Sequence, residues 1–451
     1  MGCDESGGDP STTFWGASTP SAVAHQFTHT PGLMSSTPLP FQGFVFWPVG
    51  TGDSTTVVVR NDDSGDADVV LQIDLHDLHE GDGDTDDKYT PMVDRLVELL
   101  PQRDGKPYLS TFILTHPDKD HILGFESLLD AAEIDEIWHT PRIFQEYHGD
   151  GASEPCADAK AFQKEVERRR DVTIKKEGKD IPRGDRVRII GHDSLFDEEP
   201  YKSFPKSWRH QPGHKLETLD GEDLSDRFTA FVLAPFKDTC EADQNNSSLA
   251  LHVKLTSPNG RHTAQGLFFG DLSYDTLKRI VEKTRSLKND EYLAHHTLLA
   301  PHHVSKTIMY KRIDGEDVLQ KDPEILKEFE KEQLDPAYVI ASAEPPYQTE
   351  PGKDPPHKKA RSRYEEVVEK GHFLCTHEHG DEDSPERIEF ALSDAGLTYT
   401  KPGSDDSDGD GGDDGDSGGG GGGPTAGDAA RRVRQSATPA VHTGYGASHH
   451  D

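Results

Sequence analysis

Cysteine is scarce in this chain, which has four cysteines among 451 residues. They stand far apart, at Cys3, Cys156, Cys240 and Cys375, and no two of them form a Cys-x-x-Cys pair. Disulfide-rich scaffolds and structural zinc sites both need cysteines at short, regular spacings. We therefore expect free thiols, and we exclude a disulfide framework and a thiolate metal site.

Long hydrophobic runs are also lacking. Hydrophobic residues make up 32% of the chain, and no apolar stretch approaches the ~20 residues that a membrane-spanning helix needs. Residues 1–6 contain neither the basic part nor the apolar part of a secretory signal peptide. We expect a cytoplasmic protein without a membrane partner.

Positive charge is in deficit, because 83 acidic residues face 48 lysines and arginines and give a formal net charge of −35. The segment 405–451 holds only nine acids and three arginines, so most of the excess lies elsewhere. Such a surface repels polyanions at ordinary ionic strength but is tolerated in molar salt, where the Debye length falls to ~3 Å. We interpret the protein as halophilic; the alternative is an ordinary acidic protein.

Composition divides the chain into three parts. Residues 1–40 are rich in Ser, Thr, Pro and Gly, and residues 401–451 include the run DDSDGDGGDDGDSGGGGGG. Both segments have too few apolar side chains for a core and are predicted to be flexible or disordered. Between them, 41–400 is predicted to form one folded domain. Within it, the polar stretch 149–223 is interpreted as an insertion or a substrate-facing lobe.

Strand and helix signals alternate through the middle of the chain. Strands are predicted where short runs of Val, Ile, Leu and Phe occur, at 43–49, 55–60, 69–74, 109–114, 134–138, 229–234, 249–255, 266–270, 297–300, 337–342 and 372–375. Helices are predicted from composition and apolar spacing at 91–100, 124–132, 161–170, 274–283, 323–332 and 361–370. Two groups of strands with helices interspersed predict an α/β fold, an αββα sandwich.

Four potential metal ligands stand within six residues, directly after the predicted strand 109–114. They are His116, Asp118, Asp120 and His121. Imidazole and carboxylate ligands suit Zn²⁺, Mn²⁺ or Fe²⁺ when no thiolate is offered. The alternative is chance clustering in a chain with 24 histidines and many aspartates, but so dense a run after a buried strand favours a metal site.

Three other strand ends carry the same residue types, namely Asp271, the pair His302 and His303, and Asp74. A carboxylate at the position of Asp271 can bridge two metals, and Asp74 can brace a ligand from behind. The alternatives are an ordinary Gly-Asp turn, a hydrogen-bonded histidine pair and a plain strand-end aspartate.

The order of these motifs resembles the metallo-β-lactamase superfamily, and within it the hydrolase domain of ComEC-type DNA-uptake proteins and their stand-alone relatives. The resemblance spans roughly residues 41–380 and rests on segments 49–54 (VGTGDS), 73–74 (ID), 115–124 (THPDKDHILG), 245–249 (NNSSL), 270–271 (GD) and 301–305 (PHHVS). Fainter echoes occur at 340–342, 356–357 and 376–380. The resemblance implies a metallo-β-lactamase fold and a metal-dependent hydrolase.

Three departures from the family pattern bear on the metal site. Asp118 stands where the superfamily usually has His, although relatives of the ComEC branch carry Asp there, and a carboxylate favours Mn²⁺ or Mg²⁺ somewhat over Zn²⁺. Val304 stands at a usual Gly, which is expected to tilt its loop. The third-motif histidine is not identifiable, so one metal is expected to be held weakly; the candidates are His139, His192 and His214.

The resemblance implies two divalent metal ions, Zn²⁺ or Mn²⁺, and a metal-bound hydroxide as the nucleophile. The implied ligands are His116, Asp118, Asp120, His121, Asp271, His302 and His303. One ion is expected at Asp120, His121 and one of the paired histidines, the other at His116 and Asp118, with Asp271 as the bridge. Asp118 or Asp120 is expected to orient the nucleophile.

The ComEC-type resemblance implies phosphodiester hydrolysis, so a nuclease is the preferred function and nucleic acid the candidate substrate. The acidic surface opposes this, whereas basic clusters at 164–170, 175–176 and 358–363 favour it, unless they are solvated faces. His357 is a candidate for phosphate contact or leaving-group protonation, or a surface histidine. The alternatives are a hydrolase of small esters, thioesters or lactones, and a metal-poor binding or regulatory module.

Overall fold

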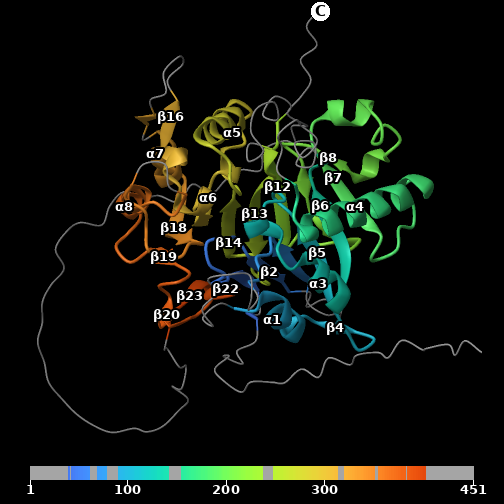
Figure 1. Ribbon diagram of the computed structural model, residues 1–451, viewed down its shortest axis with the longest axis horizontal. Helices are drawn as coiled ribbons and strands as arrows, with labels where there is room; N and C mark the ends of the chain where they lie inside the picture. The colour runs from blue at the N-terminus through green and yellow to red at the C-terminus, as the bar shows by residue number, and fades with distance from the viewer. Residues whose placement is uncertain are drawn as a thin grey trace, which may run out of the picture. The chain divides into compact units, whose positions relative to one another are not determined.

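The computed structural model describes residues 39–40, 42–60, 69–78, 90–141, 154–236, 247–312, 319–322, 324–350, 354–381 and 383–402. The predicted flexible segments 1–40 and 401–451 lie outside these residues, except at 39–40 and 401–402. Figure 1 shows the described elements, with both sheets at the centre.

The first sheet has ten strands in the order β23-β22-β1-β2-β3-β5-β6-β7-β8, with β4 paired to β5 outside this path. Its strands are β1 (Gly43–Phe46), β2 (Thr55–Val59), β3 (Val69–Ile73), β4 (Gln102–Arg103), β5 (Lys106–Ile113), β6 (Glu133–His139), β7 (Arg186–Ile190), β8 (Arg209–His210), β22 (Ile388–Ser393) and β23 (Gly396–Thr400). From β3 to β8 the neighbours run parallel.

The second sheet has seven strands in the order β19-β18-β15-β14-β13-β12-β9. Its strands are β9 (Lys215–Leu216), β12 (Phe228–Ala234), β13 (Ala250–Thr256), β14 (Thr263–Phe268), β15 (His295–Leu299), β18 (Gln333–Ala341) and β19 (Phe373–Cys375). Short two-stranded pairs are β10 (Thr218–Leu219) with β11 (Glu222–Asp223), β16 (Tyr310–Arg312) with β17 (Leu319–Lys321), and β20 (Gly380–Asp381) with β21 (Ser384–Pro385).

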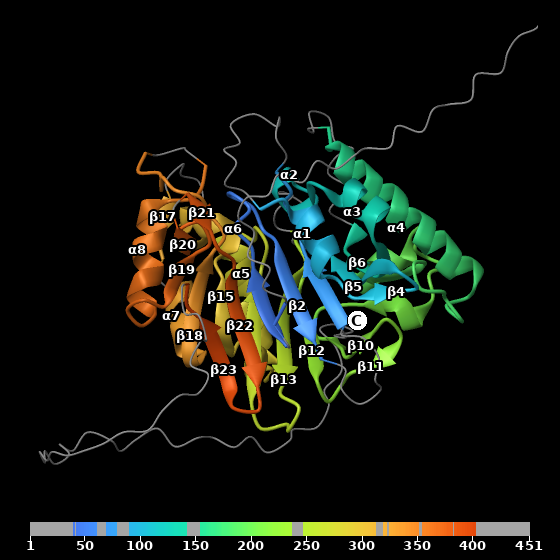
Figure 2. The same ribbon diagram turned by 90° about the horizontal axis from the view of Figure 1, so that it is seen from below.

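Eight α-helices accompany the sheets in the described residues: α1 (Met92–Leu99), α2 (Lys119–Ile122), α3 (Phe125–Ala131), α4 (Ala157–Lys175), α5 (Tyr274–Ser286), α6 (Pro301–Val304), α7 (Glu324–Lys331) and α8 (Lys358–Val367). Figure 2 shows both sheets between α1, α3 and α4 on one side and α7 and α8 on the other.

Three hydrophobic cores fill the spaces between these layers. One joins the first sheet to α1, α3 and α4, a second joins the second sheet to α5, α7 and α8, and the third lies between the two sheets. Strands such as β2 and β3 are buried along their whole length, because each sheet is covered on both faces. The predicted αββα sandwich is confirmed.

The stretch 149–223 was predicted as an insertion, but its described residues supply a helix and several strands to the two sheets. Helix α4 buries Phe162 and Val166 in the core against the first sheet. Strand β7 pairs in parallel with β6, and β9 pairs with β12 of the second sheet. The polar character of the stretch comes from the outward face of α4 and from loops.

The parallel strands place the candidate ligands at one end of the sandwich. Asp74 follows β3 and His116 follows β5, and these strands are hydrogen-bonded neighbours. Asp271 follows β14 and the pair His302 and His303 follows β15, which are neighbours in the second sheet. Because parallel strands end at the same edge, four segments distant in sequence meet there.

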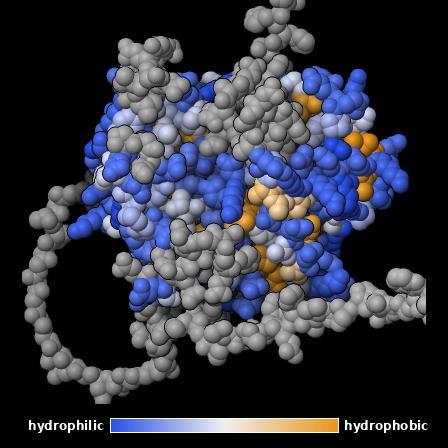
Figure 3. Space-filling model, viewed as in Figure 1, coloured by the Kyte–Doolittle hydropathy of each residue, from blue (hydrophilic) through white to orange (hydrophobic). Residues whose placement is uncertain are grey.

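Hydrophilic residues predominate on the described part of the face that Figure 3 draws. On the face drawn in Figure 3, hydrophobic side chains form only small groups among hydrophilic ones. Within the described residues, no helix is long and apolar enough to cross a membrane.

Buried neutral histidines are expected to make the fold acid-sensitive. Burial lowers the pKa of His139 to about 3 and those of His252 and His295 to about 4, whereas the unfolded chain takes up these protons near pH 6.5. The free energy of unfolding therefore decreases as the pH falls from 6.5 toward 4. Each of these groups contributes a loss of ~1.4 kcal/mol per pH unit, and the three together contribute ~4 kcal/mol per pH unit. Urea midpoints at stepped pH values measure this loss.

The variant His252→Gln should reduce the loss of stability by ~1.4 kcal/mol per pH unit, because glutamine keeps a donor but does not titrate. His262→Gln is the matched control, since the His262 side chain is partly exposed. A urea midpoint that stays constant from pH 6.5 to 5 would contradict the prediction.

Candidate metal centre

The loop after β5 delivers the first four ligand candidates. His116 lies in the extended segment after the strand, Asp118 precedes α2, and Asp120 and His121 lie within this single helical turn. Backbone hydrogen bonds fix the turn from two sides: Asp53 N donates to Asp120 O at 3.0 Å, and Leu75 N donates to His121 O at 2.8 Å.

Gly52, in the turn between β1 and β2, packs so closely against this loop that only glycine fits. A Cβ placed on Gly52 would lie 2.2 Å from His76 Nδ1 and 2.7 Å from Asp120 O. No side chain fits there without displacing the turn that carries Asp53.

The second pair of loops supplies the remaining candidates. His302 N donates to Gly270 O at 3.1 Å, which ties the histidine loop to the Asp271 turn. His302, His303 and Val304 have φ of 51°, 48° and 64°, a left-handed conformation that costs non-glycine residues ~1–2 kcal/mol each. Val304, at the position of the family's usual Gly, therefore takes up a conformation favoured by glycine, and its side chain is fully buried.

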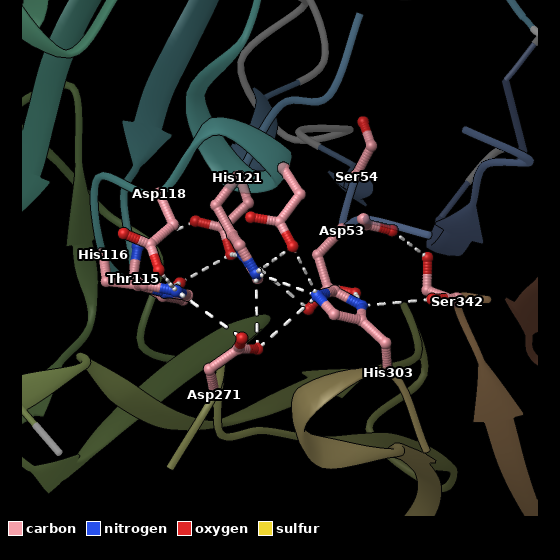
Figure 4. A network of polar contacts seen from close by, with 12 residues as sticks. Asp53, Ser54, Thr115, His116, Asp118, His121, Asp271, His303 and Ser342 are labelled. Carbon is pink, nitrogen blue, oxygen red and sulfur yellow. Dashed lines mark hydrogen bonds and ion pairs between the residues drawn. The ribbon is translucent and has the colours of Figure 1, made fainter. Parts of the chain in front are cut away.

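Four imidazole nitrogens converge on the carboxylate of Asp271. Its Oδ1 lies 3.3 Å from His121 Nε2 and 3.6 Å from His303 Nε2. Its Oδ2 lies 3.8 Å from His116 Nε2 and 3.6 Å from His302 Nε2. Each oxygen of one buried carboxylate thus faces its own pair of histidines, and Figure 4 shows His116, His121 and His303 around Asp271.

The set at Oδ1 has the dimensions of a tetrahedral metal site. Asp120, His121, Asp271 and His303 offer ligand atoms that all lie within 4.8 Å of one another. His121 Nε2 is 3.2 Å from His303 Nε2 and 3.9 Å from Asp120 Oδ2, and His303 Nε2 is 3.1 Å from Asp120 Oδ2. Ligands at 2.0–2.2 Å from a tetrahedral ion are separated by about 3.3–3.6 Å, so these residues can hold a metal ion.

The set at Oδ2 is looser. His116 Nε2 lies 3.6 Å from Asp118 Oδ2, and His302 adds a second imidazole. Among the described residues, this set does not form a group whose ligand atoms are all mutually close. The geometry therefore favours the set with Asp120 as the tighter of the two.

The rear nitrogens of three histidines are held by acceptors. His121 Nδ1 lies 2.8 Å from Asp74 Oδ2, and His303 Nδ1 lies 3.1 Å from Ser342 O. His116 Nδ1 lies 3.1 Å from Thr115 Oγ1, whose own proton goes to Asp74. With Nδ1–H donated backward, each Nε2 carries a lone pair directed at the site, as in metal-binding histidines.

Two buried atoms at the centre support the same conclusion. His116 Nε2 and Asp271 Oδ1 have no hydrogen-bond partner among the described residues. Such atoms are costly to bury unless another group satisfies them. A cation between the histidine pairs and Asp271 would satisfy both, so the residues present fit metal ions.

Without metal, His121 and His303 hold protons where a cation would otherwise lie. Burial lowers the pKa values of His121 and His303, but the surrounding carboxylates, Asp271 first, outweigh it and raise both well above their ordinary value. Burial raises the pKa of Asp271, but His303 and His121 hold it well below its ordinary value. The cluster is thus an anionic site that attracts positive charge.

The structure brings together all seven residues predicted as ligands, whereas the candidates for the third-motif histidine lie elsewhere. His139 packs edge-on against Phe162 in the core, His192 caps a 3₁₀ turn, and His214 lies near His210. No potential metal-binding group in the described part of the chain includes them.

Two residues near the site were not identified as contributors from the sequence. Asp53 Oδ1 lies 3.5 Å from His303 Nδ1, and His76 is buried beside the Gly52 turn. Asp53 belongs to the VGTGDS segment, so the sequence identified its motif but not its contact with His303. His76 has no comparable signal, since it follows Asp74 in an ordinary loop.

Asp74 is expected to control metal affinity without being a ligand. It accepts from Thr115 N and Thr115 Oγ1, both at 2.7 Å, and from the His121 ring. Asp74→Asn keeps the size and tolerates the left-handed φ of 54°, but its amide group loses the charge and one acceptor. We expect metal affinity to fall ~10–100-fold, measured by competition with a chromogenic chelator. Asp94→Asn, on the exposed side of α1, should leave it unchanged.

Comparisons with known proteins add one distant likeness. No protein-family model matches the chain, and no curated protein matches it. Among solved structures, it is similar to an archaeal metallo-beta-lactamase superfamily protein from Sulfolobus tokodaii, with 12% identity and a TM-score of 0.22, over 64% of this chain and 95% of that chain.

Proposed function

We propose that the chain is a metal-dependent hydrolase of phosphodiester bonds that acts on nucleic acid. The proposal is based on the position of Asp271 between two pairs of histidines. One pair faces its Oδ1 and the other pair faces its Oδ2. A bridging carboxylate between two ligand sets is the arrangement that two-metal hydrolases need. The resemblance of the motifs to the ComEC-type hydrolase domain supports a phosphodiester as the bond.

The residues divide into two ligand sets in this proposal. One ion would be held by Asp271 Oδ1 with Asp120, His121 and His303, and the other by Asp271 Oδ2 with His116, Asp118 and His302. When bound, divalent ions of this kind supply Lewis acidity and lower the pKa of water toward neutrality. Two imidazoles with carboxylates suit Zn²⁺ or Mn²⁺.

Asp118 and Asp120 are the predicted catalytic carboxylates, and both are open to solvent. Both have side chains 34% exposed, whereas Asp271 is 5% exposed. Asp120 lies 3.1 Å from His303, and Asp118 lies 3.6 Å from His116. In this proposal either carboxylate can orient the attacking water from the open side of the site.

The approach of a substrate is set by the same exposures. The side chains of His116, His121 and His303 are at most 1% exposed, and that of His302 is 24% exposed. The site therefore opens on the side of Asp118, Asp120 and His302. A phosphate entering there would meet its negative charge unless metal ions neutralise the carboxylates first.

Of the predicted basic clusters, 164–170 is largely committed to the fold. Arg169 is buried and donates to Ile134 O and Arg186 O. Arg168 pairs with Glu165 and Asp185. This helix is therefore a weak candidate for contact with a polyanion, and the proposal relies on the lysines around His357 instead.

The test is hydrolysis by purified protein in high salt with Mn²⁺ or Zn²⁺. Single-stranded DNA, double-stranded DNA and bis-p-nitrophenyl phosphate are offered beside a panel of p-nitrophenyl esters and a lactone. We expect cleavage of the phosphodiesters and little turnover of esters. Ester or lactone turnover without phosphodiester cleavage would replace the proposal with the small-molecule alternative.

Metal content and two ligand variants complete this test. Asp120→Ala and His121→Ala should abolish the hydrolysis, and retention of activity in both would refute the site. Purified protein that keeps less than about one ion per chain after dialysis against Zn²⁺ would instead favour a binding or regulatory module.

A further inference from the structure

A hollow of about 180 Å³ lies beside the histidine loop of the candidate metal centre. The side chains that matter in its lining are Lys306, Tyr310, Glu350, His357 and Lys359. Helix α8 begins directly after His357. The hollow thus lies at the start of that helix, in the segment of the chain that follows the predicted ligands.

The hollow is connected to the metal centre through the backbone. His357 N donates to Val304 O at 3.2 Å, and Val304 directly follows His303. Lys306 is three residues beyond His303, so their Cα atoms lie within about 10 Å of each other. This span corresponds to one or two nucleotides of a single strand.

The lining offers cations and an aromatic ring. Among the described residues, neither Lys306 nor Lys359 has a carboxylate partner, and Glu350 is the one acidic side chain in the lining. The His357 ring accepts from Lys306 N at Nδ1, at 3.3 Å. Two ammonium groups and the half-buried Tyr310 provide the charge and the stacking surface that single-stranded nucleic acids use.

We propose that this hollow binds a phosphate of the substrate strand next to the one that is cleaved. The inference rests on the proposed function, since it assigns a second subsite to the same substrate. Lys306 and Lys359 neutralise this phosphate, and His357 holds the Lys306 backbone in place. The subsite places positive charge beside the candidate metal centre of a chain whose net charge is −35.

The double variant Lys306→Gln, Lys359→Gln tests the subsite. We expect kcat/KM for a short single-stranded DNA to fall about tenfold. Hydrolysis of bis-p-nitrophenyl phosphate should stay unchanged, because this substrate has only the phosphate that is cleaved. DNA binding in chelator, followed by fluorescence anisotropy, should show a salt slope shallower by ~0.7 for the lost contact.

The control is Lys283→Gln, Lys327→Gln, which removes the same charge from exposed positions on α5 and α7. It should leave both substrates unaffected. If the double variant cleaves DNA as fast as the unsubstituted protein does, and both cleave bis-p-nitrophenyl phosphate, the subsite is overturned while the proposed hydrolase activity stands. Failure of the unsubstituted protein on both substrates would instead overturn the proposed function, and the subsite with it.

Discussion

Replacing Asp271 with asparagine is expected to reduce phosphodiester hydrolysis at least about a thousandfold and to release bound metal. The amide keeps the volume of the carboxylate but replaces one oxygen with an NH₂ group, which has no lone pair to offer. One histidine pair therefore loses its acceptor, whichever way the amide turns. Turnover numbers and metal content after dialysis measure the two effects together.

Asp275→Asn provides the matched control for this variant, because Asp275 is an exposed carboxylate in the first turn of α5. It removes the same charge four residues away and should change neither quantity by more than about twofold. An Asp271→Asn protein that retains both metal and activity would mean that the carboxylate does not bridge. The model of two ligand sets would then be wrong.

Metal affinity is expected to rise steeply with pH. In the metal-free protein, carboxylates led by Asp271 raise the pKa values of His121 and His303 well above 6.5. An incoming ion must displace both protons, so below these raised pKa values the apparent affinity falls up to ~100-fold for each unit of pH lost. Competition between the protein and a chelator for Zn²⁺, at stepped pH values, measures the slope.

The variant His303→Gln isolates one of the two protons. Its affinity is lower at every pH, but its slope should fall to about tenfold per unit, because only His121 still competes. His262→Gln should keep the full slope. An affinity independent of pH between 6 and 7 would show that these imidazoles are already neutral, against the charge balance of the cluster.

The same raised pKa values affect the stability of the metal-free fold in a separate window. His121 and His303 stabilise the fold while they are protonated, and this contribution is lost as the pH rises from 6.5 through their raised pKa values. It is therefore opposite in sign to the acid loss from His139, His252 and His295. Bound metal replaces those protons and should remove the alkaline part of the effect.

The sequence was most informative where the chemistry is local. Four candidate ligands of two types, His and Asp, stand within His116–His121 directly after a predicted strand. Helix α2 holds two of them in a single turn. The αββα layers follow from hydrophobic runs that alternate with helical spacing. Strands β22 and β23 were not predicted, because their sequences mix apolar and polar residues. Their strand structure depends on the pairing of β22 with β1 and on apolar side chains that pack in the core between the sheets.

A third-motif histidine cannot be identified from sequence position alone. His139 ends a strand near the site in sequence, as a ligand might, yet it packs against Phe162 in the core. Conversely, Asp53 lies in a recognised motif, but its contact with His303 depends on a turn pressed against α2. Sequence position does not distinguish a ligand from a core side chain, because the difference is the direction in which the side chain points.

By itself, the sequence determined which residue types stand at the strand ends, and thus that an acidic chain with few cysteines offers imidazoles and carboxylates that could hold a metal ion. Only the tertiary structure decided how they pair. Asp271 lies more than 140 residues from the His116 loop, and its two oxygens face separate histidine pairs because neighbouring parallel strands end together. Distances of a few ångströms between remote segments depend on how the sheets pack, and no local pattern encodes them.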